Sequence, residues 1–301
     1  MSLTQGVGIQ VAVLYGGPSS EAEISRKSGK AVAAALRERA FTVHEIDFST
    51  AALPPLPPGT QVVFPALHGR FGEDGELQDL LQAAGMPFVG SGAIASRLIM
   101  DKQATKDCLV KHGLPVIPGM LIHQMTSAPP AHLRLPLIVK PNLEGSTIGL
   151  SKVEQPAQWA GALTAAMRFG GGAVVEAFIK GRECTVGLLD GVALPVVEIV
   201  PPGDVFDYDA KYTYAQGKTE YFCPPKSFSP ALQKGLASMA EQAFKALGAR
   251  DLLRVDFIVE ESSGQPYILE GNSLPGFTAT SLLPKAASVA GLAFPELCAK
   301  L

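Results

Sequence analysis

The first hundred residues alternate between apolar runs typical of buried strands and amphipathic runs typical of helices. Consecutive parallel strands need a crossover between them, and a helix is the usual one. The alternation therefore predicts an α/β segment over residues 1–100, built on an open parallel sheet with helices on both faces. Ser20, followed three residues later by Glu23, predicts a capping box at the start of the first helix. The expected strands are 10–15, 41–46, 61–67 and 87–89, and the expected helices are 21–39 and 76–84.

The rest of the chain has a less regular pattern. A chain of 301 residues is long enough for two domains or three small ones. We expect two α+β segments after the first, over residues 101–180 and 181–301, with a polar loop near 204–221 in the second of them. The expected strands are 137–140, 172–179, 184–189, 193–200, 252–259 and 267–272, and the expected helices are 157–168, 230–247 and 284–290.

The composition excludes several classes of protein. Hydrophobic residues make up 47% of the chain and charged residues 18%, which is enough for a sizeable core. With a net charge of -3, the chain is not dominated by attraction to a nucleic-acid backbone. Its four cysteines include no C-x-x-C pair and are too few for a disulfide framework. Because the sequence has no long apolar run and no signal peptide, we expect a cytoplasmic protein that does not enter a membrane.

A glycine pattern at 90–95 matches the G-x-G-x-x-A variant of the dinucleotide-binding fingerprint. The strand before it is very short, and the acidic residue that should follow about 20 positions later is absent. We therefore interpret this pattern as a tight turn between a strand and a helix. The sequence also has no P-loop, no H-E-x-x-H motif and no histidine pair with metal-ligand spacing.

The strongest local signal is a pair of strands near the carboxyl end. Side chains alternate across a strand, so Arg254 and Asp256 share one face, and Glu270 and Asn272 share one face of the next strand. A hairpin turning at Gly264 brings these four side chains together. Two carboxylates and an amide are oxygen donors, which suit a hard cation such as Mg²⁺. The alternative is a hairpin with a polar, solvated outer face.

Two loops after strands carry weaker signals. Lys140 ends an apolar strand and precedes a loop of small residues over 142–149, which either presents a cation and backbone amides to phosphate or is an ordinary surface loop. His68 begins a glycine-rich loop where a strand of the parallel sheet ends, which is where open sheets bind ligands. A lone histidine there is more often a structural hydrogen-bonding group.

Two helix starts are also candidates. Glu21 lies near the amino end of the first helix, where the helix dipole alone explains a carboxylate. Ser281 either caps the helix that follows it or binds a carboxylate at that helix terminus. Gly276, after Pro275, forms a turn that allows a backbone N–H to approach a ligand closely.

Taken together, eight segments resemble the D-alanine–D-alanine ligase family, in the family's order and over nearly the whole chain. The resemblance implies the ATP-grasp fold, with ATP held between the central and carboxyl-terminal segments. It also implies Mg²⁺ (with Mn²⁺ as a substitute), a homodimer, and ligation of two D-alanines for peptidoglycan precursor synthesis. The segments are 14–25, 66–69, 100–102, 139–141, 144–146, 209–212, 254–256 and 269–276.

The resemblance further implies a nucleotide and metal site. Lysines are expected on the phosphates, a glutamate and backbone groups on adenine, a second glutamate on the ribose, and oxygen ligands on Mg²⁺. The residues are, in that order, Lys102, Lys140 and Lys211; Glu176, Ala177 and Ile179; Glu183; and Asp256, Glu270 and Asn272.

The amino-acid site is implied in the same way. Glu21, with His68 nearby, is expected to bind the ammonium group of the first D-alanine. Ser281 and Leu282 are expected to bind the carboxylate of the second, and Arg254 and the Gly276 N–H to face the oxyanion. The remaining implied residues are Ser146 and Tyr212, which would join Glu21 in a hydrogen-bonded set that ties a lid over 204–221 to the site.

Some positions differ from the family pattern. Phe206 replaces a tyrosine, Ala177 replaces a lysine, and the lid is slightly long. These differences affect the expected packing of the lid and not the expected reaction. Two other hypotheses stay open: another ATP-grasp carboxylate–amine ligase, including one that joins D-alanine to D-lactate, and a nucleotide-binding module without catalysis.

Overall fold

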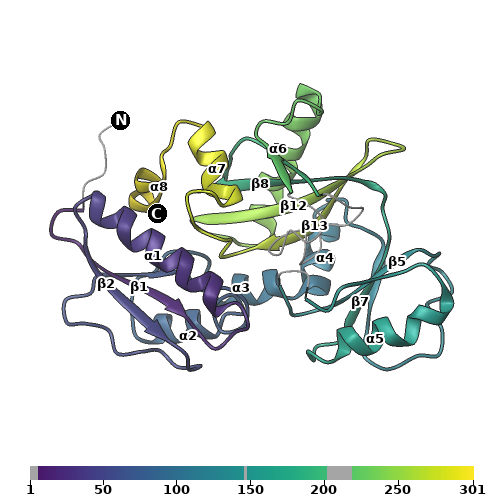
Figure 1. Cartoon of the computed structure of the whole chain (residues 1–301), viewed down its shortest axis with the longest axis horizontal. Helices are drawn as coiled ribbons and strands as arrows, with labels where there is room; N and C mark the ends of the chain where they lie inside the picture. Colours follow the sequence, from purple (N-terminus) through teal and green to yellow (C-terminus); the bar gives the residue numbers. More distant parts are fainter. Residues whose placement is uncertain (1–5, 146–147, 202–218) are drawn as a thin grey trace.

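The computed structural model describes residues 6–145, 148–201 and 219–301, which form three sheets in succession along the chain (Figure 1). The first sheet is parallel, in the order β2–β1–β3, as the alternation of strands and helices predicts. The expected strand at 87–89 is reduced to a single parallel bridge between Val63 and Phe88. The elements here are β1 (Gln10–Gly16), α1 (Ala22–Glu38), β2 (Thr42–Phe48), β3 (Val62–Pro65) and α2 (Glu76–Ala83).

Both faces of this sheet are buried because the side chains of β1 alternate between two cores. Leu14 packs with Leu77 of α2 on one face, and Val13 packs with Val32 of α1 on the other. Leu14 and Leu77 have no exposed surface. Burying a side chain of this size stabilises the fold by about 1.5–3 kcal/mol.

The predicted capping box at α1 is wrong. The residue at the helix N-cap is Glu21, not Ser20, and Glu23 pairs with Arg26 one turn later. The hydroxyl that stabilises this turn belongs to Ser19. Its Oγ accepts a hydrogen bond from the Glu21 N–H at 3.2 Å and donates to the carbonyl of His68 at 2.7 Å.

The central sheet is antiparallel, in the order β4–β7–β5–β6. Its outer face packs on α5, where Trp159 is fully buried. Its inner face carries the alternate residues of β5 and β7, among them Lys140 and Glu176. The elements are β4 (Gly119–Ile122), β5 (Leu137–Pro141), β6 (Ser151–Val153), a 3₁₀ turn at Pro156–Gln158, α5 (Trp159–Met167) and β7 (Ala173–Ala177).

The third sheet is antiparallel, in the order β11–β10–β8–β12–β13, with β9 paired to β8. Val255 and Phe257 of β12 point into a core shared with α6, whereas Arg254 and Asp256 point the other way. The elements are β8 (Gly181–Leu189), β9 (Val192–Ala193), β10 (Val197–Val200), β11 (Glu220–Phe222), α6 (Pro230–Ala246), β12 (Leu252–Glu260) and β13 (Pro266–Asn272).

The hydrophobic cores cross the segments proposed from the sequence. Helices α3 (Ala93–Met100) and α4 (Lys102–Lys111) contact β13 of the third sheet. Helix α7 (Leu282–Val289) contacts β8 of the third sheet, and α8 (Phe294–Lys300) lies beside α1 (Figure 1); both helices contribute to the core that also contains β1 of the first sheet. The sequence did not predict α8. The division at residues 100 and 180 stays a proposal based on the sequence.

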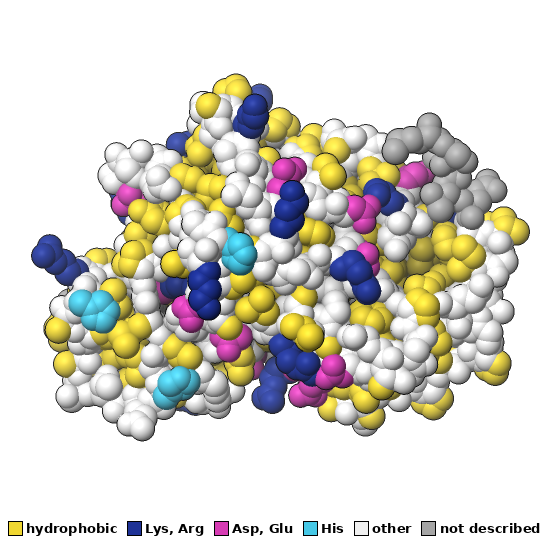
Figure 2. Space-filling model, turned by 180° about the vertical axis from the view of Figure 1, so that it is seen from behind, with side chains coloured by type: hydrophobic (Ala, Val, Ile, Leu, Met, Phe, Trp, Pro, Cys, Tyr) yellow, Lys and Arg dark blue, Asp and Glu magenta, His cyan; other side chains and the backbone are white. Residues whose placement is uncertain are grey.

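In the described part of the chain, no single helix is long and apolar enough to cross a membrane. Only α7 and α8, joined by a bend of 103°, meet that length and composition as a pair. On the face shown in Figure 2, charged side chains of both signs are interspersed, in keeping with the small net charge.

Candidate active site

The inner faces of the second and third sheets, together with loops of the first segment, enclose a cavity of about 1480 Å³. Every residue that the sequence analysis assigned to a site, and that the structure describes, lines this cavity. Ser146, Lys211 and Tyr212, with residues 204–218 of the proposed lid, lie outside the described residues, and the last two residues of the proposed lid, 220–221, belong to β11. The lining residues are Glu21, His68, Lys102, Lys140, Glu176, Ala177, Ile179, Glu183, Arg254, Asp256, Glu270, Asn272, Gly276, Ser281 and Leu282.

The hairpin of β12 and β13 forms as predicted and pairs the four polar residues across its strands. Arg254 is opposite Asn272, and Asp256 is opposite Glu270. The guanidinium of Arg254 donates to both carboxylate oxygens of Asp256, at 2.9 and 2.8 Å. This bidentate contact fixes the plane of the guanidinium.

Asp256 is also held from the sides. Thr185 Oγ1 on β8 donates to its Oδ1 at 2.6 Å, and the amide nitrogen of Asn272 donates to its Oδ2 at 3.0 Å. Because the side-chain nitrogen of Asn272 points at Asp256, the side-chain oxygen of Asn272 points away from Asp256. Asp256 is therefore a fixed carboxylate.

The donor set on this hairpin fits a hard divalent cation. Asp256, Glu270 and Asn272 supply oxygen atoms from neighbouring strands, and all three line the cavity. Among the described residues, no three Asp, Glu, His or Cys side chains form a metal site of their own. Mg²⁺ usually binds through one or two carboxylates and completes its shell with water and substrate phosphates, which matches a set this small.

Two lysines, Lys102 and Lys140, also line the cavity. Lys102 lies 3.7 Å from Glu270 and donates to the carbonyl of Glu144. Burial lowers the pKa of Lys102, and the nearby Glu270 only partly offsets this effect. For Lys140, burial also lowers the pKa, but Glu176 and Glu270 more than offset it and the pKa is raised.

Glu176, expected on adenine, is bound by two lysines. Lys140 Nζ lies 2.9 Å from Oε2, and Lys106 Nζ lies 2.7 Å from Oε1. The sequence analysis missed Lys106. Its position four residues after Lys102 on a helix was the available signal, because residues at that spacing lie on one helix face.

The Glu21 carboxylate lies where the first and central segments meet. A Cβ atom added to Gly69 would lie 2.7 Å from Glu21 Oε2, and one added to Gly145 would lie 3.3 Å from it. Gly69 has a φ of +71°, which favours glycine as well. A side chain at either position would crowd the Glu21 carboxylate, more strongly at Gly69 than at Gly145.

His68 is buried and connects the first segment to the loop after β13. Its Nδ1 lies 3.0 Å from the carbonyl oxygen of Leu274, and its Nε2 lies 3.0 Å from Ser28 Oγ. Ser28 Oγ in turn accepts a hydrogen bond from the Phe277 N–H at 3.2 Å. Burial lowers the pKa of His68, and the nearby Glu21 only partly offsets this effect.

Glu73 is a second residue that the sequence analysis missed. Its carboxylate accepts hydrogen bonds from the N–H of Gly69 at 2.7 Å and of Leu274 at 3.3 Å. Burial, and secondly the charge of Glu21, raise the pKa of Glu73 to about 8. Ser28 and Glu73 therefore fix the loop of Gly276 from two sides.

Ser281 occupies the N-cap position of α7, but its side chain does not cap the helix. Its Oγ accepts a hydrogen bond from the Thr278 N–H at 3.0 Å and lies 2.9 Å from Thr278 Oγ1. The hydroxyl thus closes the loop of Gly276 onto the start of α7. Ser281 and Leu282 line the cavity at the amino end of α7, and the N–H groups at a helix start suit a carboxylate.

The glycine pattern at 90–95 has a structural explanation, as the sequence analysis expected. The N–H of Gly90 donates to the carboxylate of Asp251 at 2.8 Å, and Gly90 has a φ of +104°. The turn leads from the Phe88 bridge into α3, and it lines neither of the two described cavities.

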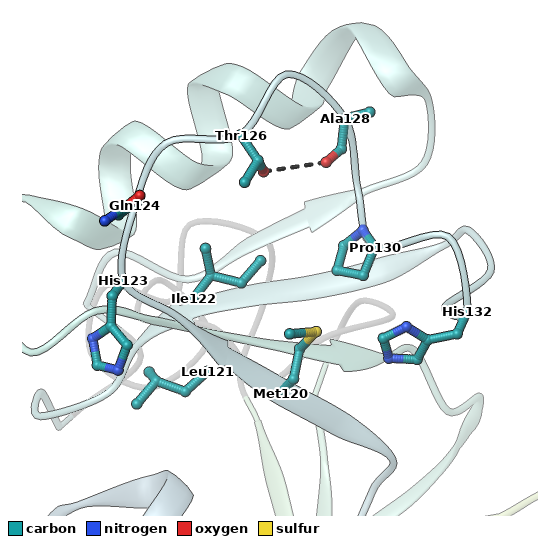
Figure 3. A pocket seen from close by; sticks show the side chains of 9 residues that line it. All are labelled: Met120, Leu121, Ile122, His123, Gln124, Thr126, Ala128, Pro130 and His132. Carbon is teal, nitrogen blue, oxygen red and sulfur yellow. Dashed lines mark hydrogen bonds between the residues drawn. The ribbon is translucent and has the colours of Figure 1, made fainter.

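A smaller hollow of about 530 Å³ lies at β4, the edge strand of the central sheet (Figure 3). Its lining is mostly apolar, and His123 and His132 lie at opposite sides of it (Figure 3). None of the predicted site residues contributes to it.

The comparison with known proteins decides the family. The model of the D-ala D-ala ligase C-terminus matches residues 109–301, and the model of the N-terminus matches residues 48–91. The chain belongs to the D-alanine–D-alanine ligase family. The D-alanine–D-alanine ligases of Pelotomaculum thermopropionicum and Syntrophotalea carbinolica are 42% and 43% identical to this family member, each over 97% of its length and over 95% and 94% of theirs.

A solved structure of this ligase family agrees with the fold. The D-alanine–D-alanine ligase of Bacillus anthracis, crystallised with ATP, has a TM-score of 0.81 and 29% identity to this family member, and the match covers 96% of it and 94% of the Bacillus chain. The ATP-grasp fold expected from the sequence is thereby confirmed.

Proposed function

We propose that this protein joins two molecules of D-alanine into D-alanyl-D-alanine, a peptidoglycan precursor, with ATP as co-substrate and ADP and phosphate as products. The observation that carries the proposal is the β12–β13 hairpin. In a chain of this family, it brings Arg254, Asp256, Glu270 and Asn272 to one wall of a cavity lined by lysines.

The reaction explains why such charges gather. A carboxylate is a poor electrophile, so ATP first converts it to an acyl phosphate. That step brings two anions together and needs cationic groups fixed around them. The amine of the second D-alanine then attacks the carbonyl carbon, and phosphate leaves.

At the nucleotide end, Lys102 and Lys140 are the proposed phosphate contacts. Glu176 and the backbone at Ala177 and Ile179 are the proposed adenine contacts. The N–H of Ala177 already donates to the carbonyl of Pro118 at 3.0 Å, so its remaining backbone group is the carbonyl. Glu183 on β8 is the proposed ribose contact, and Lys211 is a further proposed phosphate contact.

Asp256, Glu270 and Asn272 would hold Mg²⁺, or Mn²⁺, which accepts the same oxygen ligands. When bound, the cation neutralises phosphate charge during transfer. Asp256 is pre-oriented for this by Thr185 and Arg254.

At the amino-acid end, Glu21 is the proposed partner of the first ammonium group, and neutral His68 lies beside it without competing charge. The second carboxylate would lie at the start of α7, near Ser281 and Leu282. Arg254 and the Gly276 N–H would donate to the oxyanion, and Ser146 and Tyr212 would tie the lid to Glu21. An acyl phosphate hydrolyses readily, so water must be excluded while it exists.

The test is ADP release coupled to a spectroscopic assay, with D-alanine, L-alanine and D-lactate offered in parallel. We expect turnover that requires D-alanine and Mg²⁺, with D-alanyl-D-alanine as the product. Turnover only with another amine or hydroxy acid would identify a sibling ligase. ATP binding without turnover on any of the three substrates would contradict the proposal.

The family also implies a homodimer and a cytoplasmic location, which stay part of this proposal. Sedimentation equilibrium with and without ATP tests the dimer, and cell fractionation tests the location. A monomer at all concentrations, or recovery with membranes, would contradict these two points without affecting the reaction.

A further inference from the structure

Glu176 is a buried carboxylate held between two buried lysines. Its side chain is 3% exposed, that of Lys106 is 5% exposed and that of Lys140 is 10% exposed. Lys106 binds Oε1 and Lys140 binds Oε2, so each carboxylate oxygen has its own cation. Three elements supply the group: β7 carries Glu176, the adjacent β5 carries Lys140, and α4 carries Lys106.

The two lysines differ in what else they can reach. Lys140 and Glu176 line the cavity, whereas Lys106 does not. Lys106 lies behind the carboxylate, away from any nucleotide. Its carbon chain is enclosed beside Thr105 and Leu109 of α4, which are also buried. Lys106 therefore acts on a ligand in the cavity indirectly, and Glu176 is the cavity residue that it binds.

Under the proposed function, Lys140 contacts a phosphate of ATP as well as Glu176. When it contacts a phosphate, its attraction to Glu176 weakens, because one ammonium group is then shared between two anions. A buried carboxylate without a cation takes up a proton or turns away. Burial alone raises the pKa of Glu176, and Lys140 and Lys106 together lower it below its usual value.

We propose that Lys106 is a positioning residue for the nucleotide base, which keeps the Glu176 carboxylate ionised and oriented while Lys140 contacts phosphate. The inference rests on the proposed function, in which Glu176 accepts a hydrogen bond from the exocyclic amino group of adenine. A fixed, ionised acceptor favours a base with an amino group at that position and disfavours one with a carbonyl oxygen there. Lys106 thus contributes to the choice of ATP over GTP or ITP.

The experiment compares Lys106→Met, which keeps the apolar stem but removes the charge, with the wild type. We expect KM for ATP to rise at least about tenfold, which corresponds to about 1.4 kcal/mol, while KM for D-alanine changes less than about twofold. The ratio of kcat/KM for ATP over ITP should fall. Lys106→Arg, which keeps the charge, should restore much of the ATP preference.

Lys111→Met is the matched control, because Lys111 is an exposed lysine on the same helix. It should leave both KM values unchanged. If Lys106→Met does not fold, as judged by its thermal transition, Lys106→Gln replaces it, because an amide still donates to Glu176 without a charge.

A double-mutant cycle separates positioning from general destabilisation. If Lys106 acts through Glu176, the double variant Lys106→Met/Glu176→Gln should bind ATP no more weakly than Glu176→Gln alone. Additive losses, or an unchanged ATP/ITP ratio in Lys106→Met, would overturn the inference. A wild type that binds ATP but does not use D-alanine would instead contradict the proposed function, and the binding cycle would still report on Lys106.

Discussion

His68 donates a hydrogen bond from Nδ1 to the carbonyl oxygen of Leu274, a residue 206 positions away in the chain, at 3.0 Å. A carbonyl oxygen can only accept, so Nδ1 carries the proton. Nε2 of the neutral ring then accepts from the Ser28 hydroxyl, whose oxygen accepts from the Phe277 N–H. One buried imidazole thereby fixes both ends of the segment that contains Gly276.

The first prediction concerns His68 and the stability of the protein at low pH. Because the pKa of His68 is lowered by burial, the unfolded chain binds more protons than the folded one between that lowered pKa and the ordinary value of about 6.5. Stability therefore rises with pH across this window and falls on acidification. Measured relative to His68→Gln, the thermal midpoint of the wild type should fall as the pH is lowered below about 6.5. His123→Gln, at an exposed histidine, should show the same fall relative to His68→Gln as the wild type does.

The second prediction concerns Ser28. Ser28→Ala leaves the Phe277 N–H without its acceptor and His68 Nε2 without its donor. We expect a loss of about 1–3 kcal/mol in the free energy of unfolding. We also expect kcat to fall by about tenfold or more, since small displacements near reacting groups are costly.

Ser25→Ala is the control for Ser28. Ser25 is also buried on α1, but its Oγ binds Gly16 and Ala66 of the first sheet. It should lose similar stability with kcat little changed. Equal kcat in the two variants would show that Ser28 does not position the Gly276 loop.

The third prediction concerns Arg254. Arg254→Ala removes the proposed oxyanion donor, which is also the bidentate partner of Asp256. We expect kcat to fall by about 10²–10³-fold, the usual effect of losing one such donor. ATP binding, measured by calorimetry, should persist. Turnover equal to the wild type would remove Arg254 from the mechanism.

The fourth prediction concerns Glu73, whose pKa is raised from 4.5 to about 8. The folded protein binds more protons than the unfolded chain between these values, so this residue lowers stability as pH rises from 4.5 to about 8. The difference in thermal midpoint between Glu73→Gln and the wild type should therefore shift in favour of Glu73→Gln as pH rises over this window, in addition to a constant offset from the altered contacts to Gly69 and Leu274. For Glu76→Gln, at an exposed carboxylate three residues on, the difference from the wild type should stay constant over this window.

The sequence predicted the parts of the site that depend on local pattern. Residues two apart on a strand must share a face, so the pairing of Arg254 and Asp256 with Glu270 and Asn272 followed once a hairpin was assumed. Ser28 and Glu73 were not predicted because nothing local marks them, and Lys106 was not predicted because its helical spacing from Lys102 does not show what it binds. Their partners lie 249, 201 and 70 residues away in the chain. Ser20 and Glu23 matched a capping pattern, but the hydroxyl at this turn belongs to Ser19, which donates to the carbonyl of His68. That contact comes from a loop 49 residues away and is not visible in the local sequence.

Helix α8 packs against α1 beside the first sheet, and Leu297 is buried in the core that also contains Val13 and Val32. During synthesis, β1 and α1 leave the ribosome long before α8 is translated. One face of the first sheet therefore stays incompletely covered until nearly all of the chain has emerged. A nascent chain stalled before residue 294 is expected to be a better chaperone substrate than the released protein.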